Sequence, residues 1–359
     1  MKKIDMARKA VGFTLMAMLL GMGLSSCSKA RDNGTDNNGG EALMKDGTMP
    51  VGEMREMDGN LPPMEGGIPG MQMQKGEIYS TKAAKVYEDV HYASVSDSEV
   101  CDIYLPESSE KTPVLILVHG GGFAFESNRM SLMESVAVKA IEKGYAVVAV
   151  DYRKSGEASF PGALSDVKAA VRFVKANADE YNLDETKIAI WGESAGDYLS
   201  LMTSLTSQVK ELDGDVKDNE GYSSSVNVLV DFYGPVEFYT MDEEYNSLGV
   251  KDTTYSTDSS FESRFLGQAI GKDKDTTYRT YWESYVSSLP EDFSLKTWIQ
   301  AGTSDKNVPY TQSSNFGKRL ANVIGEENVH SSLIEGAAHM DKAFYTDENL
   351  EAVFAFIGF

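Results

Sequence analysis

The sequence predicts an α/β domain, in which a mainly parallel sheet is covered by helices on both faces. Two observations predict it. Strand-like apolar runs alternate with helical runs from Tyr79 onward. Residues 113–118 are apolar throughout, which is typical of a strand covered on both faces. With 359 residues, of which 42% are hydrophobic, the chain is long enough for one large domain with appendages.

Eight segments have the apolar and β-branched composition of strands. They are residues 85–90, 101–105, 113–118, 145–150, 187–191, 226–231, 295–300 and 330–334. Helices are expected over 131–144 and 166–182, and a third begins near Tyr198. The acidic, aromatic-rich segment 236–290 interrupts this alternation. An insertion of that length usually covers the binding crevice. The alternative is a surface segment that contributes to packing and has no role in binding.

The first 27 residues resemble the signal peptide of a bacterial lipoprotein. A basic start precedes an apolar run that is too short for a permanent membrane span, and Leu24-Ser25-Ser26-Cys27 follows it. The resemblance implies cleavage before Cys27, acylation of its thiol, and a lipid anchor in the membrane. Such a protein belongs to the cell envelope, in the periplasm or on the cell surface. An ordinary signal peptide is the alternative.

Residues 28–78 form a low-complexity segment rich in Gly, Pro and Met, which predicts a flexible tether ahead of a domain over 79–359. The methionines raise the alternative of a copper(I) site. Their irregular spacing, without interleaved His or Cys, favours a linker. With Cys27 acylated, Cys101 is the only free thiol, so no disulfide within the chain is expected.

The chain carries 55 acidic and 33 basic residues, a net charge of −22. Nucleic acids and anionic lipid surfaces are bound through clustered Lys and Arg, so this balance argues against both as partners. A neutral substrate fits it better than an anionic one.

The motif Gly192-Glu193-Ser194-Ala195-Gly196 joins a strand to a helix within five residues. So sharp a turn needs positions without bulky Cβ atoms. It would raise Ser194 out of the turn at the start of the helix. A serine hydroxyl becomes a good nucleophile only when a base takes its proton, so Ser194 requires a histidine.

The chain has only four histidines. Three of them, His91, His119 and His330, fit structural positions. His339 remains, in a small-residue loop after the last predicted strand. Asp305, in the loop after the preceding strand, would fix the tautomer of that histidine. The order Ser194, Asp305, His339 is the order expected in an α/β-hydrolase.

A glycine-rich loop, His119-Gly120-Gly121-Gly122-Phe123, follows the strand over 113–118. With no side chains in the way, the N–H groups of Gly121 and Gly122, together with that of Ala195, would bind an oxyanion. As a phosphate loop it lacks the required Lys and Ser/Thr. We expect neither a cofactor nor a metal ion.

The motifs HGGGF, DYR (151–153), GESAG and GTSDKNVPYTQSSNF resemble those of the hormone-sensitive-lipase-like and acetyl-xylan-esterase-like α/β-hydrolases, over about residues 79–359. The resemblance implies an eight-stranded, mostly parallel sheet with a cap-like insertion. It implies a serine carboxylesterase that removes acetyl or feruloyl groups from carbohydrates. It also places Phe123 and Asp197 in the substrate pocket. Asp197 replaces a small residue or histidine, so its carboxylate would narrow the acyl pocket or repel developing negative charge.

Two other functions fit parts of this pattern. One is a serine peptidase-like hydrolase, although such peptidases normally carry a propeller domain that the short tether cannot supply. The other is a catalytically silent α/β-hydrolase fold that serves as a binding protein. The candidates at all three triad positions argue against a silent fold.

Overall fold

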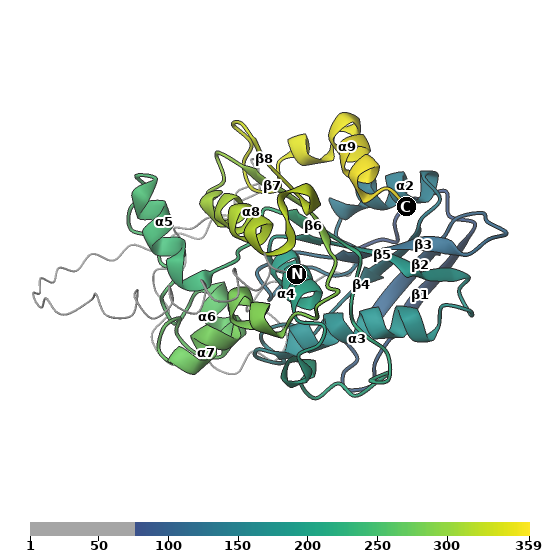
Figure 1. The fold of residues 1–359 in the computed structure, drawn as a ribbon, viewed down its shortest axis with the longest axis horizontal. Helices are drawn as coiled ribbons and strands as arrows, with labels where there is room; N and C mark the ends of the chain where they lie inside the picture. The colour runs from purple at the N-terminus through teal and green to yellow at the C-terminus, as the bar shows by residue number, and fades with distance from the viewer. Residues whose placement is uncertain (1–75) are drawn as a thin grey trace, which may run out of the picture.

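The computed structural model of the chain describes residues 76–359 (Figure 1). The expected signal peptide, Cys27 and residues 28–75 of the expected tether lie outside the described residues. Ile78, which the sequence analysis assigns to the tether, packs against the buried core. The folded body therefore begins slightly before the expected boundary at residue 79.

A single eight-stranded sheet in the order β1-β2-β4-β3-β5-β6-β7-β8 forms the centre of the body. All eight expected strands are present: β1 (Lys85–His91), β2 (Val100–Leu105), β3 (Thr112–Val118), β4 (Ala146–Val150), β5 (Leu183–Glu193), β6 (Val228–Phe232), β7 (Lys296–Gly302) and β8 (Val329–Ile334). β2 pairs antiparallel with β1 and with β4, and every other neighbouring pair is parallel. The carboxyl ends of β3 and β5–β8 therefore share one edge, where ligands bind in sheets of this kind.

Helices cover both faces of the sheet. They are α2 (Met133–Glu142), α3 (Gly162–Ala176), α4 (Ala195–Leu205), α8 (Thr311–Ile324) and α9 (Asp347–Ile357), with short 3-10 turns η1 (Lys210–Asp213), η4 (Glu326–Asn328) and η5 (Lys342–Tyr345). Buried residues of α3, α4 and α8 belong to the apolar core on one face, and those of α2 and α9 to the core on the other. Figure 1 shows α3 on the side of the sheet opposite α2 and α9.

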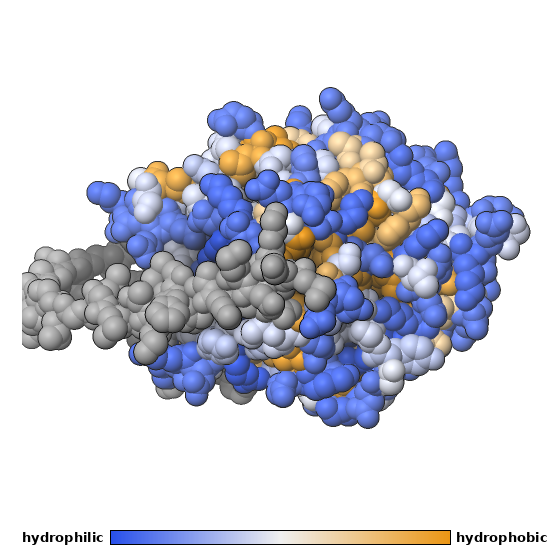
Figure 2. All heavy atoms as spheres, in the orientation of Figure 1, coloured by the Kyte–Doolittle hydropathy of each residue, from blue (hydrophilic) through white to orange (hydrophobic). Residues whose placement is uncertain are grey.

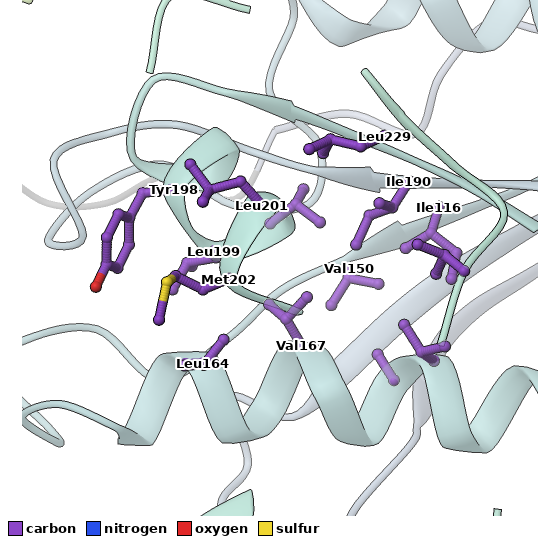
Figure 3. Packing of buried hydrophobic residues seen from close by; sticks show 14 of the residues in the cluster. Ile116, Val150, Leu164, Val167, Ile190, Tyr198, Leu199, Leu201, Met202 and Leu229 are labelled. Carbon is purple, nitrogen blue, oxygen red and sulfur yellow. The ribbon is translucent and has the colours of Figure 1, made fainter. Parts of the chain in front are cut away.

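The larger core lies between β3–β5 and the helices α3 and α4. Leu164 and Val167 of α3 point toward Leu199 and Met202 of α4, and Ile190 lies above them on the sheet (Figure 3). All of these side chains are fully buried. Burial of one such side chain stabilises the fold by about 1.5–3 kcal/mol. This packing fixes α4, and with it the turn that carries Ser194.

The segment 236–290 is helical and adds no strand to the sheet. It contains η2 (Phe238–Thr240), α5 (Met241–Ser247), α6 (Phe261–Leu266), α7 (Lys274–Arg279) and η3 (Trp282–Ser288). In Figure 1 α5, α6 and α7 lie at one end of the sheet rather than on either face. The expected insertion therefore lies beyond the end of the sheet, and its buried residues Met241, Phe265 and Trp282 join the apolar core of α3 and α4.

Hydrophilic side chains dominate the face shown in Figure 2, with smaller hydrophobic areas between them. Within residues 76–359 no helix has both the length and the hydropathy to cross a bilayer. The same residues contain no group of three or more His, Cys, Asp or Glu side chains placed to hold a metal ion.

Candidate active site

Ser194 occupies the sharp turn between β5 and α4. Its φ of 52° and ψ of −121° lie in a region that side-chain-bearing residues rarely adopt. A Cβ atom on Gly196 would meet the carbonyl oxygen of Val118 at 2.2 Å, and one on Gly192 would meet that of Gly196 at 2.4 Å. The Ser194 N–H donates to the carbonyl of Phe232 at 3.0 Å. Only glycine fits at both flanking positions, and the neighbouring strands hold the turn in place.

Ser194, Asp305 and His339, far apart in the sequence, meet at the carboxyl edge of the sheet. Nε2 of His339 lies 3.0 Å from Oγ of Ser194, and Nδ1 lies 2.7 Å from Oδ2 of Asp305. The other carboxylate oxygen of Asp305 accepts the N–H groups of Asn307 at 2.8 Å and Val308 at 2.9 Å. Because these bonds fix the carboxylate, Asp305 is placed to keep the proton on Nδ1 and to leave Nε2 free for the serine proton.

The glycine-rich loop after β3 lies directly against the serine turn. A Cβ atom on Gly120 would come within 3.2 Å of the Cβ atom of Ser194. Gly121 and Gly122 have φ angles of 99° and 58°, in the left-handed region that favours glycine. Gly122 and Ala195 line the cavity in front of Ser194, whereas Gly121 is not among its lining residues. The loop thus brings backbone N–H groups next to the serine without side chains between them.

His119 supports this loop instead of acting on substrate. Its Nδ1 lies 2.7 Å from the carbonyl oxygen of Gly120, and its ring stacks on Tyr152 at 4.4 Å. Nε2 lies 3.1 Å from both Nζ of Lys154 and Oδ1 of Asp151. Burial and the nearby Lys154 ammonium lower the pKa of His119, so its neutral form is favoured. A neutral ring donates from Nδ1 to Gly120 and accepts at Nε2 from Lys154.

A cavity opens in front of Ser194. Its lining residues are Gly122, Phe123, Ser194, Ala195, Pro235, Thr254, Tyr255, Ser260, Phe261, Glu262, Asn307, Val308 and His339. Phe123 lines the pocket, as the resemblance implies. Five of the lining residues, from Thr254 to Glu262, belong to the insertion. The insertion therefore contributes a wall of the cavity, as expected of a crevice cover. Tyr255 and Phe261 belong to the aromatic residues that mark the insertion in the sequence, but none of the five was expected to have a role in the site.

The expectation that Asp197 lines the substrate pocket is not met. Asp197 is fully buried, is absent from the cavity wall, and faces Asp231 and the backbone of Gly234. A Cβ atom on Gly234 would lie 1.8 Å from Oδ2 of Asp197, so glycine makes room for the carboxyl. Burial and the carboxyl of Asp231 raise the pKa of Asp197 far above its usual range. The neutral form of Asp197 is therefore favoured, and a neutral carboxyl does not repel an oxyanion.

A second buried acid lies behind the histidine. The carboxyl of Glu193 faces the hydroxyls of Tyr345 and Tyr233, which also bond to each other. Burial raises the pKa of Glu193 to about 7, and these hydroxyls and His339 partly oppose the rise. The Tyr233 ring meets the His339 ring edge-on at 4.9 Å. Sequence reasoning missed this cluster, because no local pattern relates residue 233 to residue 345.

The profile of the BD-FAE family matches residues 101–320, which is more than half of the chain. Among protein sequences, the probable carboxylic ester hydrolase LipM of Mycobacterium tuberculosis (strain ATCC 25618 / H37Rv) is 30% identical over 255 residues. That alignment covers 68% of this chain and 54% of LipM. This chain spans about half or less of the length of LipM and of three other curated relatives that it matches.

Two solved structures resemble the described fold. A truncated carbohydrate esterase from gut microbiota has a TM-score of 0.68 and 25% identity, covering 79% of this chain and 98% of that one. A bifunctional GH43-CE protein of Bacteroides eggerthii has a TM-score of 0.66 and 26% identity, covering 76% of this chain and 35% of that one. Both likenesses agree with the eight-stranded sheet and its covering helices.

Proposed function

We propose that this chain, which belongs to the BD-FAE family of α/β-hydrolase carboxylesterases, cleaves small acyl esters through a covalent acyl-enzyme on Ser194. One observation carries the proposal. A serine, an imidazole and a carboxylate lie in a continuous chain of contacts of 3.0 Å and 2.7 Å, and the serine and the imidazole line a cavity.

Each group has a role in acyl transfer. Oγ of Ser194 attacks the ester carbonyl while Nε2 of His339 takes its proton, and the N–H groups of Gly121, Gly122 and Ala195 stabilise the oxyanion. The alcohol leaves with the proton from His339, and the acyl group stays on Ser194. A water molecule, deprotonated by His339, then releases the acid and restores the serine. Asp305 stabilises the imidazolium in both halves.

The substrate class in this proposal is an acetyl or feruloyl ester of a carbohydrate. It is supported by the family, whose members are bifunctional acetyl and feruloyl esterases, and by the likeness to a carbohydrate esterase. The cavity adds support of its own, because polar side chains of the insertion line it together with the apolar side chains of Phe123 and Val308. Polar groups in an otherwise apolar pocket fix the orientation of a ligand with several hydroxyls.

Hydrolysis of p-nitrophenyl acetate by the purified protein tests the proposed chemistry. Ser194→Ala is expected to abolish the enzymatic rate, and a silent binding protein would show no rate to lose. A screen of acetylated xylan, feruloylated sugars and simple aryl esters then tests the substrate class. Hydrolysis of the aryl esters alone would reject the carbohydrate assignment and leave the serine mechanism in place.

The lipid anchor and an envelope location also belong to the proposal. They are supported by the sequence of residues 1–27 only. Cells grown with radiolabelled palmitate are expected to label the wild-type chain, whereas Cys27→Ser should remain unlabelled and leave the membrane fraction. Equal labelling of both chains would reject acylation at Cys27.

A further inference from the structure

We infer that Glu262 of the insertion is a specificity residue, which hydrogen-bonds hydroxyl groups on the sugar side of the ester. This inference rests on the proposed function and names a recognition group for it. The candidate stands out because it is a buried carboxyl group in the wall of the cavity that the proposed mechanism leaves unused.

The position of Glu262 is fixed by its neighbours in the insertion. The ring of the preceding Phe261 lies on Gly122, where an added Cβ atom would meet Cγ of the ring at 2.9 Å. Phe261 also meets Phe125 edge-on at 5.4 Å, and three residues after Glu262, Phe265 stacks on Phe123 at 4.0 Å. These contacts hold the backbone of α6 on both sides of Glu262 against the glycine-rich loop that follows β3, called the oxyanion loop below. Glu262 therefore has a defined place in the cavity wall.

Glu262 lies inside the protein without a cationic partner. Its exposed fraction is 8%, and no Lys, Arg or His within residues 76–359 forms an ion pair with it. Its carboxyl accepts from the Ser260 hydroxyl and from its own backbone N–H. A carboxyl group offers about four acceptor positions, or a donor and several acceptors when protonated. The carboxyl therefore keeps unused capacity for hydrogen bonding, and Glu262 lines the cavity.

Burial raises the pKa of Glu262 to about 7, and a nearby Asp242 adds to this rise. Near neutral pH the group can thus both donate and accept hydrogen bonds. Hydroxyl groups, which also donate and accept, are its natural complement. An anionic alcohol would be repelled, because the site already holds this carboxyl and the chain carries a net charge of −22.

Neighbouring groups make this a polar wall. Thr254, Tyr255, Ser260 and Asn307 also line the cavity. The Tyr255 hydroxyl donates to the carbonyl of Asn307 at 2.8 Å, so this wall is joined to the loop that carries Asp305. A pocket built to hydrogen-bond hydroxyls discriminates strongly against analogues that lack them, because its buried polar groups are then left unpaired.

The test compares two acetyl esters that differ only in the alcohol: a neutral acetylated xylo-oligosaccharide and p-nitrophenyl acetate. For Glu262→Ala in the full chain, we expect the ratio of kcat/KM on the sugar ester to kcat/KM on the aryl ester to fall about tenfold or more. Most of the fall should be in KM. Glu262→Gln, which keeps a donor and an acceptor, should recover most of the ratio. Asp258→Ala removes an exposed carboxylate of the same insertion and should leave the ratio unchanged.

The outcomes separate the inference from the proposed function. If Glu262→Ala lowers both activities by the same factor, or Glu262→Gln is as poor as Ala at equal thermal stability, the residue is structural and the inference is overturned. The proposed function would survive that result. If the wild-type chain cleaves the aryl ester but no sugar ester, the carbohydrate assignment and the inference fail together.

Discussion

The ring of Phe261 lies directly over Gly122, close enough that a Cβ atom on the glycine would meet Cγ of the ring at 2.9 Å. Gly122 also has a φ of 58°. Gly122→Ala should therefore displace both the oxyanion loop and the insertion. The loss of one oxyanion donor lowers kcat by about 10²–10³. Steady-state kinetics on p-nitrophenyl acetate measure the fall in kcat of this variant.

Gly221→Ala is the matched control, because a Cβ atom there meets nothing within 4 Å. It should retain wild-type activity. A Gly122→Ala variant with an unchanged kcat would show that this loop does not bind the oxyanion.

Asp305→Asn should lower kcat by about 10⁴ with little change in KM, because an amide favours the wrong tautomer of His339. The fold should persist, since the amide oxygen can still accept from Asn307 and Val308. Asp341→Asn is the control. Its side chain caps the backbone N–H of Ala343, a role that asparagine also fills. Equal activity of the two variants would remove Asp305 from the mechanism.

The buried pair of Asp197 and Asp231 predicts a pH-dependent stability. Burial raises the pKa of Asp231 to about 7 and that of Asp197 far above its usual range. The folded state therefore holds these protons more tightly than the unfolded state, whose carboxyls titrate near pH 4. The contribution of this pair to the free energy of unfolding is full below about pH 4, where the carboxyls are protonated in both states. It is lost as the pH rises through about 7.

Asp197→Asn removes one of these titrating groups. We expect the fall in Tm between pH 5 and pH 8 to be smaller by a few degrees than in the wild type. Calorimetry across that range measures the change of Tm with pH. Asp258→Asn, at an exposed position, is the control and should show the wild-type change of Tm with pH. Identical slopes for wild type and Asp197→Asn would contradict the assigned protonation.

Phe265 makes an apolar contact between the insertion and Phe123 of the oxyanion loop. It is fully buried and stacks on Phe123 with an interplanar angle of 15°. Phe265→Ala should lower the free energy of unfolding by about 3–5 kcal/mol, because it leaves a cavity in the core. Urea denaturation measures this change. Leu248→Ala, at a half-exposed position of the insertion, should stay within about 0.5 kcal/mol of the wild type. If Phe265→Ala lowers the free energy of unfolding by less than about 1 kcal/mol, Phe265 is not a buried contact between the insertion and Phe123.

The strands and the turn around Ser194 were predictable because their signals are local, whereas His339 followed from elimination among four histidines and Asp305 from the order of the three residues along the chain. A strand covered on both faces is apolar throughout, and the turn around Ser194 needs glycines at fixed positions. Helices α8 and α9 were not expected. The buried residues of α8 include Phe316, Leu320 and Val323, which have the spacing of a helix. The serines and other polar residues between them make this pattern hard to recognise in the sequence.

Contacts between segments that are far apart in the chain could not be predicted from the sequence. The family resemblance placed Asp197 in the pocket, but a helix turns its side chain away toward Asp231. The side chain of Glu262 comes from a segment without strand or helix periodicity. Only the packing of Phe261 and Phe265 shows that it reaches the cavity.

The most direct test of the central claim is to locate the nucleophile with a fluorophosphonate probe and peptide mass spectrometry. The account predicts a single adduct on Ser194, formed at the rate at which esterase activity is lost, and no adduct in Ser194→Ala. An adduct on another residue that accompanies the loss of activity, or esterase activity retained by Ser194→Ala, would contradict it.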